Sequence, residues 1–153
     1  MHSLVVELRD YTGTRVVKAS YMKNKSSREA IRPTDAELDI LNVLWRLGPS
    51  TVRQAHEELV QLKAWQYATT LKLMQIMAGK GLLDRDDSVR SHVYRPAIQR
   101  HDTQRQLVGR LIDRVFEGSV GSLLLGALDA RPTSKKELDQ LRQLIDERAK
   151  GRK

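Results

Sequence analysis

The sequence predicts a mainly α fold: a winged helix-turn-helix of three helices plus a short β-ribbon wing, followed by a helical dimerisation domain. Three observations predict it. Two capping signals each open a helical apolar pattern within residues 33–62. A third helical pattern starts near Tyr67, and beyond Gly81 the apolar residues alternate as they do in strands. The expected domains are an N-terminal extension at 1–32, the winged helix at 33–99 and the dimerisation domain at 100–153.

The N-terminal extension, residues 1–32, differs in composition from the rest. β-Branched residues flank a Thr-Gly-Thr turn signal at 12–14, which suggests a hairpin. Residues 22–30 are polar and basic, as a flexible arm would be. We expect this segment to be flexible. Met22 precedes a lysine-rich stretch typical of an amino terminus, and we hypothesise that residues 1–21 are an upstream extension.

Two capped helices form the first half of the predicted domain. Thr34 and Glu37 make a capping box, and the helix that they open ends at Gly48-Pro49. Its inward stripe is expected to consist of Leu38, Leu41, Leu44 and Trp45. Thr51 and Gln54 make a second capping box. The expected inner face of this second helix consists of Val52, Ala55, Leu59 and Leu62.

The third predicted helix starts near Tyr67 and ends at Gly79 and Gly81. Its spacing assigns to the inner face Thr70, Leu73, Met74 and Met77. The residues left facing outward are Ala68, Thr69, Lys72, Gln75 and Ile76. Residues 82–86 and 91–96 then predict two short strands joined by residues 87–90. Three helices and a ribbon in this order are the layout of a winged helix-turn-helix.

Three amphipathic segments follow from Asp102 onward. They carry much apolar surface but too little chain to build an independent core. Ordinary packing or a partner surface could account for single leucines. Burial against a second copy of the chain would cover the apolar faces of all three segments. We therefore expect a homodimer held by residues 102–150. The candidate dimerisation residues are Leu107, Leu111, Phe116, Leu124, Leu138, Leu141 and Ile145.

Composition excludes several classes of function. The chain has no cysteine, which rules out disulfides and thiolate metal sites and agrees with a cytoplasmic location. It has no apolar run long enough for a membrane span, so no membrane insertion is expected. The four histidines lack ligand spacing, and no catalytic motif or phosphate loop is present. We expect no metal, no cofactor and no enzymatic activity.

The charge favours an anionic partner, but only locally. The net charge is +8, yet Lys and Arg number 8 against 8 Asp and Glu within residues 33–99. The excess lies at the ends, with 7 against 3 in residues 1–32 and 12 against 8 in residues 100–153. Attraction to phosphate must therefore depend on where individual cations lie.

The third helix and the ribbon carry the candidate DNA contacts. A recognition helix needs short side chains, hydroxyls and a cation near its N-terminus. The helix offers Tyr67, Ala68, Thr69 and Lys72, although the same residues could simply form a solvated helix face. On the ribbon, Arg90 is the favoured phosphate ligand. His92 is a candidate contact too, with a solvated or structurally bonded histidine as the alternative. The neighbouring aspartates are expected to face away or to pair with the arginines.

Three stretches in fixed order resemble the penicillinase-repressor family. They are "TDAELDILNVLW", then Trp65 with "TTLKLMQIMAGKGLL", then "RSHVYRP", and the resemblance extends from about Pro33 to Ile145. The family comprises bacterial regulators of β-lactamase, methicillin-resistance and some copper-transport genes. The resemblance implies a winged helix that acts as a homodimeric repressor on a palindromic operator in double-stranded DNA. It would regulate resistance or stress genes and, as a further hypothesis, its own gene.

The resemblance also implies an inactivating partner, a membrane sensor protease or another protease that cuts the dimerisation region. The chain departs from the family here. Gly126-Ala127 stands where an Asn-Phe bond is cleaved in the staphylococcal repressors, and the cysteine pairs of the copper-responsive members are missing. Two other functions stay open on the residues alone: a non-specific or architectural DNA binder, and a winged-helix protein-interaction module.

Overall fold

The computed structural model describes residues 31–151 of the chain. The hairpin and the arm expected within residues 1–30 lie outside the described residues. The chain divides into two compact units, Met1–Leu107 and Val108–Lys153. Helix α5, Arg100–Val115, contains the dividing point.

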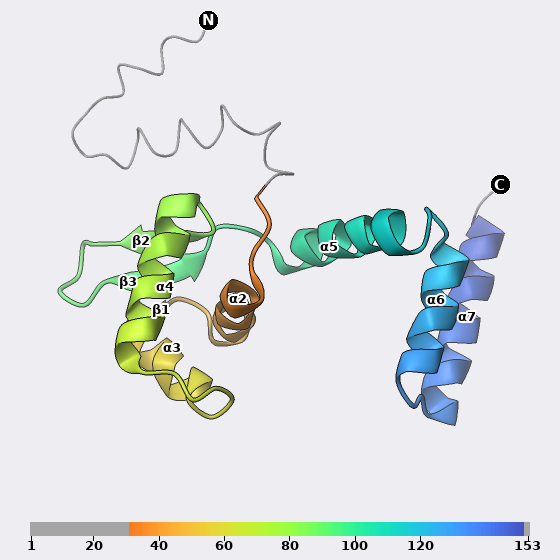
Figure 1. Ribbon diagram of the computed structural model, residues 1–153, viewed down its shortest axis with the longest axis horizontal. Coiled ribbons are helices and arrows are strands. Elements are labelled where there is room, and N and C mark those ends of the chain that lie inside the picture. Colours follow the sequence, from red (N-terminus) through yellow and green to blue (C-terminus); the bar gives the residue numbers. More distant parts are fainter. Residues whose placement is uncertain (1–30, 152–153) are drawn as a thin grey trace, which may run out of the picture. The chain divides into compact units, whose positions relative to one another are not determined.

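In the described part of the first unit, three complete helices, the start of α5 and a small sheet are present (Figure 1). The helices are α2 (Asp35–Leu47), α3 (Val52–Leu59) and α4 (Tyr67–Lys80). The strands are β1 (Ser50–Thr51), β2 (Leu83–Asp86) and β3 (Val93–Pro96), in the antiparallel order β1-β3-β2. Figure 1 shows the loop between β2 and β3 extending away from the helices, as a wing does. The predicted winged helix-turn-helix is therefore confirmed.

Strand β1 was not predicted from the sequence. β1 has only two residues, and it pairs through Ser50 with Tyr94 and through Thr51 with Val93. So short a segment shows no alternation of its own, and the pairing depends on a partner strand that lies far along the chain. In β2 and β3, Leu83 pairs with Pro96 and Asp86 with Val93, which gives the ribbon the register expected of a hairpin.

Local sequence explains where the helices begin and end. Both predicted capping boxes are present in reciprocal form, Thr34 with Glu37 and Thr51 with Gln54. Gly81 ends α4 in the left-handed conformation at φ 83°, which glycine adopts without the penalty that a β-carbon brings. These signals act within a few residues of chain, which is why the sequence was sufficient to predict them.

Among the described residues of the first unit, twelve apolar side chains form the buried core. They are Ile40, Leu41, Val43, Leu44, Val52, Ala55, Leu59, Met74, Met77, Leu82, Leu83 and Tyr94. One expectation was wrong and one was incomplete. Leu62 is 68% exposed, because α3 ends at Leu59 and cannot carry its inner face further. On α2, Leu41 and Leu44 are buried as expected, and Ile40 and Val43 are buried as well. Leu38 and Trp45 are partly buried and pack against this core.

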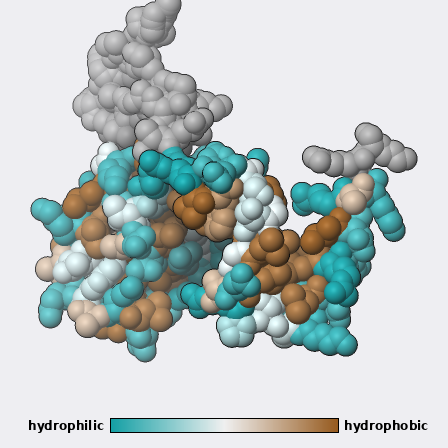
Figure 2. Space-filling view, turned by 45° about the vertical axis from the view of Figure 1, so that its right-hand side comes forward, coloured by the Kyte–Doolittle hydropathy of each residue, from teal (hydrophilic) through white to brown (hydrophobic). Residues whose placement is uncertain are grey.

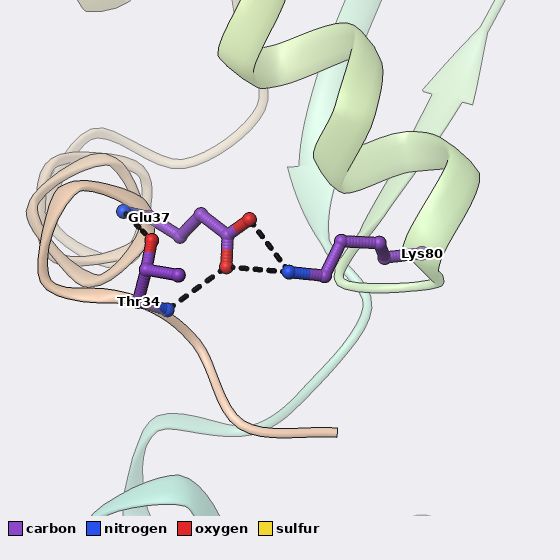
Figure 3. A network of polar contacts seen from close by, with 3 residues as sticks. All are labelled: Thr34, Glu37 and Lys80. Carbon is purple, nitrogen blue, oxygen red and sulfur yellow. Dashed lines mark hydrogen bonds and ion pairs between the residues drawn. The ribbon is translucent and has the colours of Figure 1, made fainter. Parts of the chain in front are cut away.

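A buried carboxylate ties α2 to the end of α4 (Figure 3). The Glu37 side chain is 4% exposed, and it accepts hydrogen bonds from Lys80 Nζ at 2.7 and 2.9 Å and from the Thr34 backbone N–H at 2.9 Å. Burial by itself raises the pKa of Glu37, but the Lys80 and Thr34 hydrogen bonds outweigh it and hold that pKa below its usual 4.5. Glu37 therefore serves both as a helix cap and as a fixed partner for the last turn of α4.

The second unit consists of the end of α5 and of helices α6 (Val120–Ala130) and α7 (Lys135–Gly151). A turn with Glu117 at φ 48° and Gly118 at φ 80° separates α5 from α6. A β-carbon at Gly126 would lie only 3.0 Å from the Phe116 ring, so this ring packs directly on the α6 backbone. Yet no side chain within residues 104–151 is buried. None of the helices between residues 31 and 151 combines the length and the apolar character needed to cross a membrane.

Candidate nucleic-acid interface

The face of α4 that was predicted to point outward does so. Tyr67 is 41% exposed, and Ala68, Thr69 and Lys72 are exposed too. The opposite face is anchored in the core through Thr70, Met74 and Met77, each fully buried. Because one side of α4 is fixed by packing, the exposed side presents its short polar residues in a constant orientation. Such a helix face can lie close to base edges in a major groove.

The first turn of α4 is favourable to an anion. No side chain caps the helix at Gln66, and its first turn contains no acidic residue. The free backbone N–H groups and the helix dipole therefore leave partial positive charge at this end. Lys72 lies further along the exposed face and adds a full charge.

Side chains of α3 contact this first turn, and sequence reasoning missed these contacts. His56 Nδ1 lies 2.9 Å from the Thr70 hydroxyl oxygen. The His56 ring also meets the Tyr67 ring edge-on, with centroids 5.5 Å apart. The Arg53 guanidinium lies over Tyr67, 5.8 Å from the ring centroid. No local pattern could have predicted these contacts, because the connection between α3 and α4 decides how the two helices meet.

The wing contains a set of internal ion pairs. Asp87 accepts from Arg85 Nε at 2.7 Å and lies 2.8 Å from His92 Nδ1, and Asp86 lies 3.9 Å from Arg95. Hydrogen bonds with Asp87 raise the pKa of Arg85, and hydrogen bonds from Ser88 lower the pKa of Asp86. Asp86 and Asp87 thus pair with the arginines, which was one of the two arrangements expected.

Arg90 and His92, the two candidate contacts of the wing, differ in their surroundings. His92 is held by Asp87, as in the structurally bonded alternative considered for it. Arg90 is exposed and forms no ion pair with any residue between 31 and 151. Arg90 is therefore the wing cation whose charge is free for an external phosphate.

All the candidate dimerisation residues except Phe116, which directly follows α5, lie on helices that bury no apolar side chain. Leu111, Leu138 and Ile145 are exposed at 43%, 38% and 51%. The others are half-buried: Leu107, Phe116, Leu124 and Leu141. Figure 2 shows hydrophobic side chains gathered over the C-terminal helices on the face that it draws. In the part of the chain from 31 to 151, no three histidine or carboxylate side chains converge as they would around a metal ion.

The chain is similar to several known proteins. The sequence pattern that describes the penicillinase repressor matches residues 33–147. The penicillinase repressor of Bacillus licheniformis is 25% identical over 120 residues, covering 78% of this chain and 94% of that protein. The methicillin resistance regulatory protein MecI of Staphylococcus aureus (strain N315) is 23% identical over 115 residues, covering 75% of this chain and 94% of MecI. Among solved structures, monomeric Bacillus licheniformis BlaI in complex with the blaP half-operator aligns with a TM-score of 0.42 and 26% identity, over 47% of this chain and 88% of that one.

Proposed function

Because the chain belongs to the penicillinase repressor family, we propose that it is a sequence-specific transcriptional repressor that binds a palindromic operator as a homodimer. The proposal places the protein in the cytoplasm with its DNA and assigns it no catalytic activity. The relatives are named as a penicillinase repressor and a methicillin-resistance regulator. By that analogy the target genes are resistance or stress genes.

The observation that carries the proposal is the division of α4 into two faces. Its buried face fixes the helix in the core, while Thr69 and Lys72 lie exposed on the other. Hydroxyls can accept and donate to base edges, and a lysine can meet a backbone phosphate. Arg90 on the wing would supply a phosphate contact beside the groove that α4 enters. Sequence is thus read by Thr69 and its neighbours, and position is set by the cations.

A homodimer makes so small a reading surface sufficient. One helix and one wing contact only a few base pairs, and a single copy would bind modestly. Linking two copies makes binding of the second half-site intramolecular, which multiplies affinity through effective concentration. The apolar residues left exposed on α5, α6 and α7 support a second copy as their partner. A protease that cuts these helices would release repression by separating the copies.

Binding titrations of two variants test the DNA-reading face. Lys72→Ala should weaken binding to all sequences and flatten its salt dependence by about one phosphate contact per protomer. Thr69→Ala should instead reduce discrimination between an operator selected from genomic DNA and its single-base variants, by about 1–3 kcal/mol at the affected position. If both variants matched the wild type in affinity and discrimination, the assignment of α4 would be wrong.

The same titrations separate the two rival functions. A non-specific or architectural binder would bind selected and random duplexes equally, and removal of residues 108–150, which belong to the second unit, would not change this. A protein-interaction module would not bind duplex DNA even at low salt. The repressor requires preference for the selected site and loss of tight binding when those residues are removed.

A further inference from the structure

We infer that Arg53 on α3 is an additional phosphate-binding residue and that the ring of Tyr67 is the platform on which its guanidinium rests. This inference rests on the proposed function, because it extends the DNA-binding face of α4 onto a second helix. It concerns a residue outside the recognition helix and the wing. Three observations support it: the free charge of Arg53, its contact with Tyr67, and the way in which Tyr67 itself is held.

Arg53 carries a charge that no carboxylate of the central region, residues 33–99, neutralises. The lysines and arginines of residues 33–99 are Arg46, Arg53, Lys63, Lys72, Lys80, Arg85, Arg90 and Arg95. Five of them are paired with carboxylates, and these are Arg46, Lys63, Lys80, Arg85 and Arg95. The three that form no ion pair within the described chain are Arg53, Lys72 and Arg90. Two of these three are the phosphate ligands already proposed, which makes the third a candidate for the same role.

The contact between Arg53 and Tyr67 orients this free charge. The guanidinium lies over the ring at 5.8 Å from its centroid, within the range of a cation–π interaction. This interaction restrains the guanidinium, and its N–H groups form no hydrogen bond or ion pair with any residue between 31 and 151. Those groups form the fork that binds two phosphate oxygens at once. Arg53 is exposed, so the fork is accessible from solvent.

The ring of Tyr67 is itself anchored. Tyr67 is the first residue of α4, and His56 packs edge-on against its ring. His56 is fixed in turn by its contact with the hydroxyl of Thr70, a fully buried residue. The core therefore positions His56, His56 limits the motion of the Tyr67 ring, and the ring holds Arg53. A preoriented arginine loses less conformational entropy when it binds phosphate.

One carboxylate could compete for Arg53. Glu57 follows one helical turn later on α3, but the structure records no ion pair between them among the described residues. The order, with the cation preceding the acid, is the weaker arrangement for such a pair in a helix. Both side chains are also exposed, where such pairs contribute little. Glu57 thus leaves Arg53 available to DNA.

The test uses the full-length chain and two duplexes, one of random sequence and one selected from genomic DNA. Affinity is measured for each at several salt concentrations. Arg53→Gln should weaken binding to both duplexes by about tenfold at low salt and make the salt slope shallower by about 1 per protomer. Arg46→Gln is the matched control, because Arg46 is already paired with Glu58 at 2.9 Å. It should leave the salt slope unchanged.

The platform is tested with Tyr67 variants. Tyr67→Phe keeps the ring and should preserve the contribution of Arg53. Tyr67→Leu removes the ring, so the additional effect of Arg53→Gln should shrink by about two- to fivefold in that background. Equal effects of Arg53→Gln in the Tyr67→Leu background and in the wild type would overturn the role of the ring.

The outcomes distinguish the two proposals. If the wild-type protein bound neither duplex, the proposed function would fail, and the role of Arg53 with it. If the wild type bound with sequence preference but Arg53→Gln retained the wild-type salt slope, only the role of Arg53 would be overturned. Circular dichroism of each variant confirms that the winged helix is still folded.

Discussion

The two units of this chain differ in whether they bury their apolar side chains. The winged-helix unit encloses twelve of them in a core to which all three helices and the sheet contribute. The C-terminal helices have comparable stripes of leucine, valine and isoleucine, yet none of these apolar side chains is buried. The same amphipathic pattern thus leads to a closed core in one region and to an open surface in the other. Amphipathic periodicity determines which face is apolar, but the number of elements available decides whether that face can be covered.

The largest effect is expected in the closed core. Leu44→Ala removes a fully buried side chain from α2 and should lower the free energy of unfolding by about 2–5 kcal/mol, because the transfer free energy is lost and a cavity is left. Leu47→Ala, one turn later on the same helix, is the control. Leu47 is 41% exposed, and its loss should cost about 1 kcal/mol or less. Urea denaturation measures both, and equal costs would contradict the assigned core.

The next effect tests whether the open surface is a dimer interface. Leu111→Asp and Ile145→Asp place a charge among the exposed apolar residues of α5 and α7, and each should raise the dimer dissociation constant by more than about tenfold. Leu62→Asp is the matched control, since Leu62 is 68% exposed but lies in the winged-helix unit. Analytical ultracentrifugation over a range of concentrations measures the constant. A wild type that stays monomeric, or a Leu62→Asp variant that dissociates as readily, would refute the interface.

A smaller effect is expected at the Glu37–Lys80 tie. Lys80→Met keeps the aliphatic chain but leaves the buried Glu37 carboxylate without its main partner, so unfolding should become easier by about 1–3 kcal/mol near neutral pH. Lys63→Met breaks the more exposed pair with Asp39 and should cost less than about 1 kcal/mol. Thermal or urea denaturation of the two variants compares them directly. Equal losses would mean that burial of Glu37 does not strengthen the pair.

The Glu37–Lys80 pair also predicts how the folding stability changes with pH. The pKa of Glu37 is lowered on folding, so its stabilising contribution is present above its unfolded value of 4.5 and is lost as the pH falls below that value. Removing Lys80 takes away the strongest bond that holds this pKa down, so the pKa of Glu37 should rise relative to that in the wild type. The variant should then lose less stability than the wild type between about pH 5 and about pH 3. The free energy of unfolding of the wild type and of Lys80→Met is measured as the pH is lowered. The two values should approach each other at acid pH.

Most of the architecture could be predicted because its signals are local. Capping boxes, apolar periodicity and the glycine after α4 act over a few neighbouring residues, and they located three helices and the ribbon. One error came from a contact between distant segments, and the other from the point at which a helix ends. β1 exists only because β3 is available to pair with it, and Leu62 is exposed because α3 stops at Leu59. Neither outcome is encoded in the spacing of nearby residues.

The candidate interface divides in the same way. The sequence by itself determined that Thr69 and Lys72 share the exposed face of α4, because helical periodicity follows from backbone geometry alone. Only the tertiary structure decided which cations remain free, because ion pairs depend on which side chains folding brings within a few ångströms. Lys80 is neutralised by Glu37, a residue of another helix, while Arg53 has no ion-pair partner between residues 31 and 151 and lies over the ring of Tyr67. The composition shows equal numbers of positive and negative charges in residues 33–99, and folding determines which of the positive charges are left without a carboxylate partner.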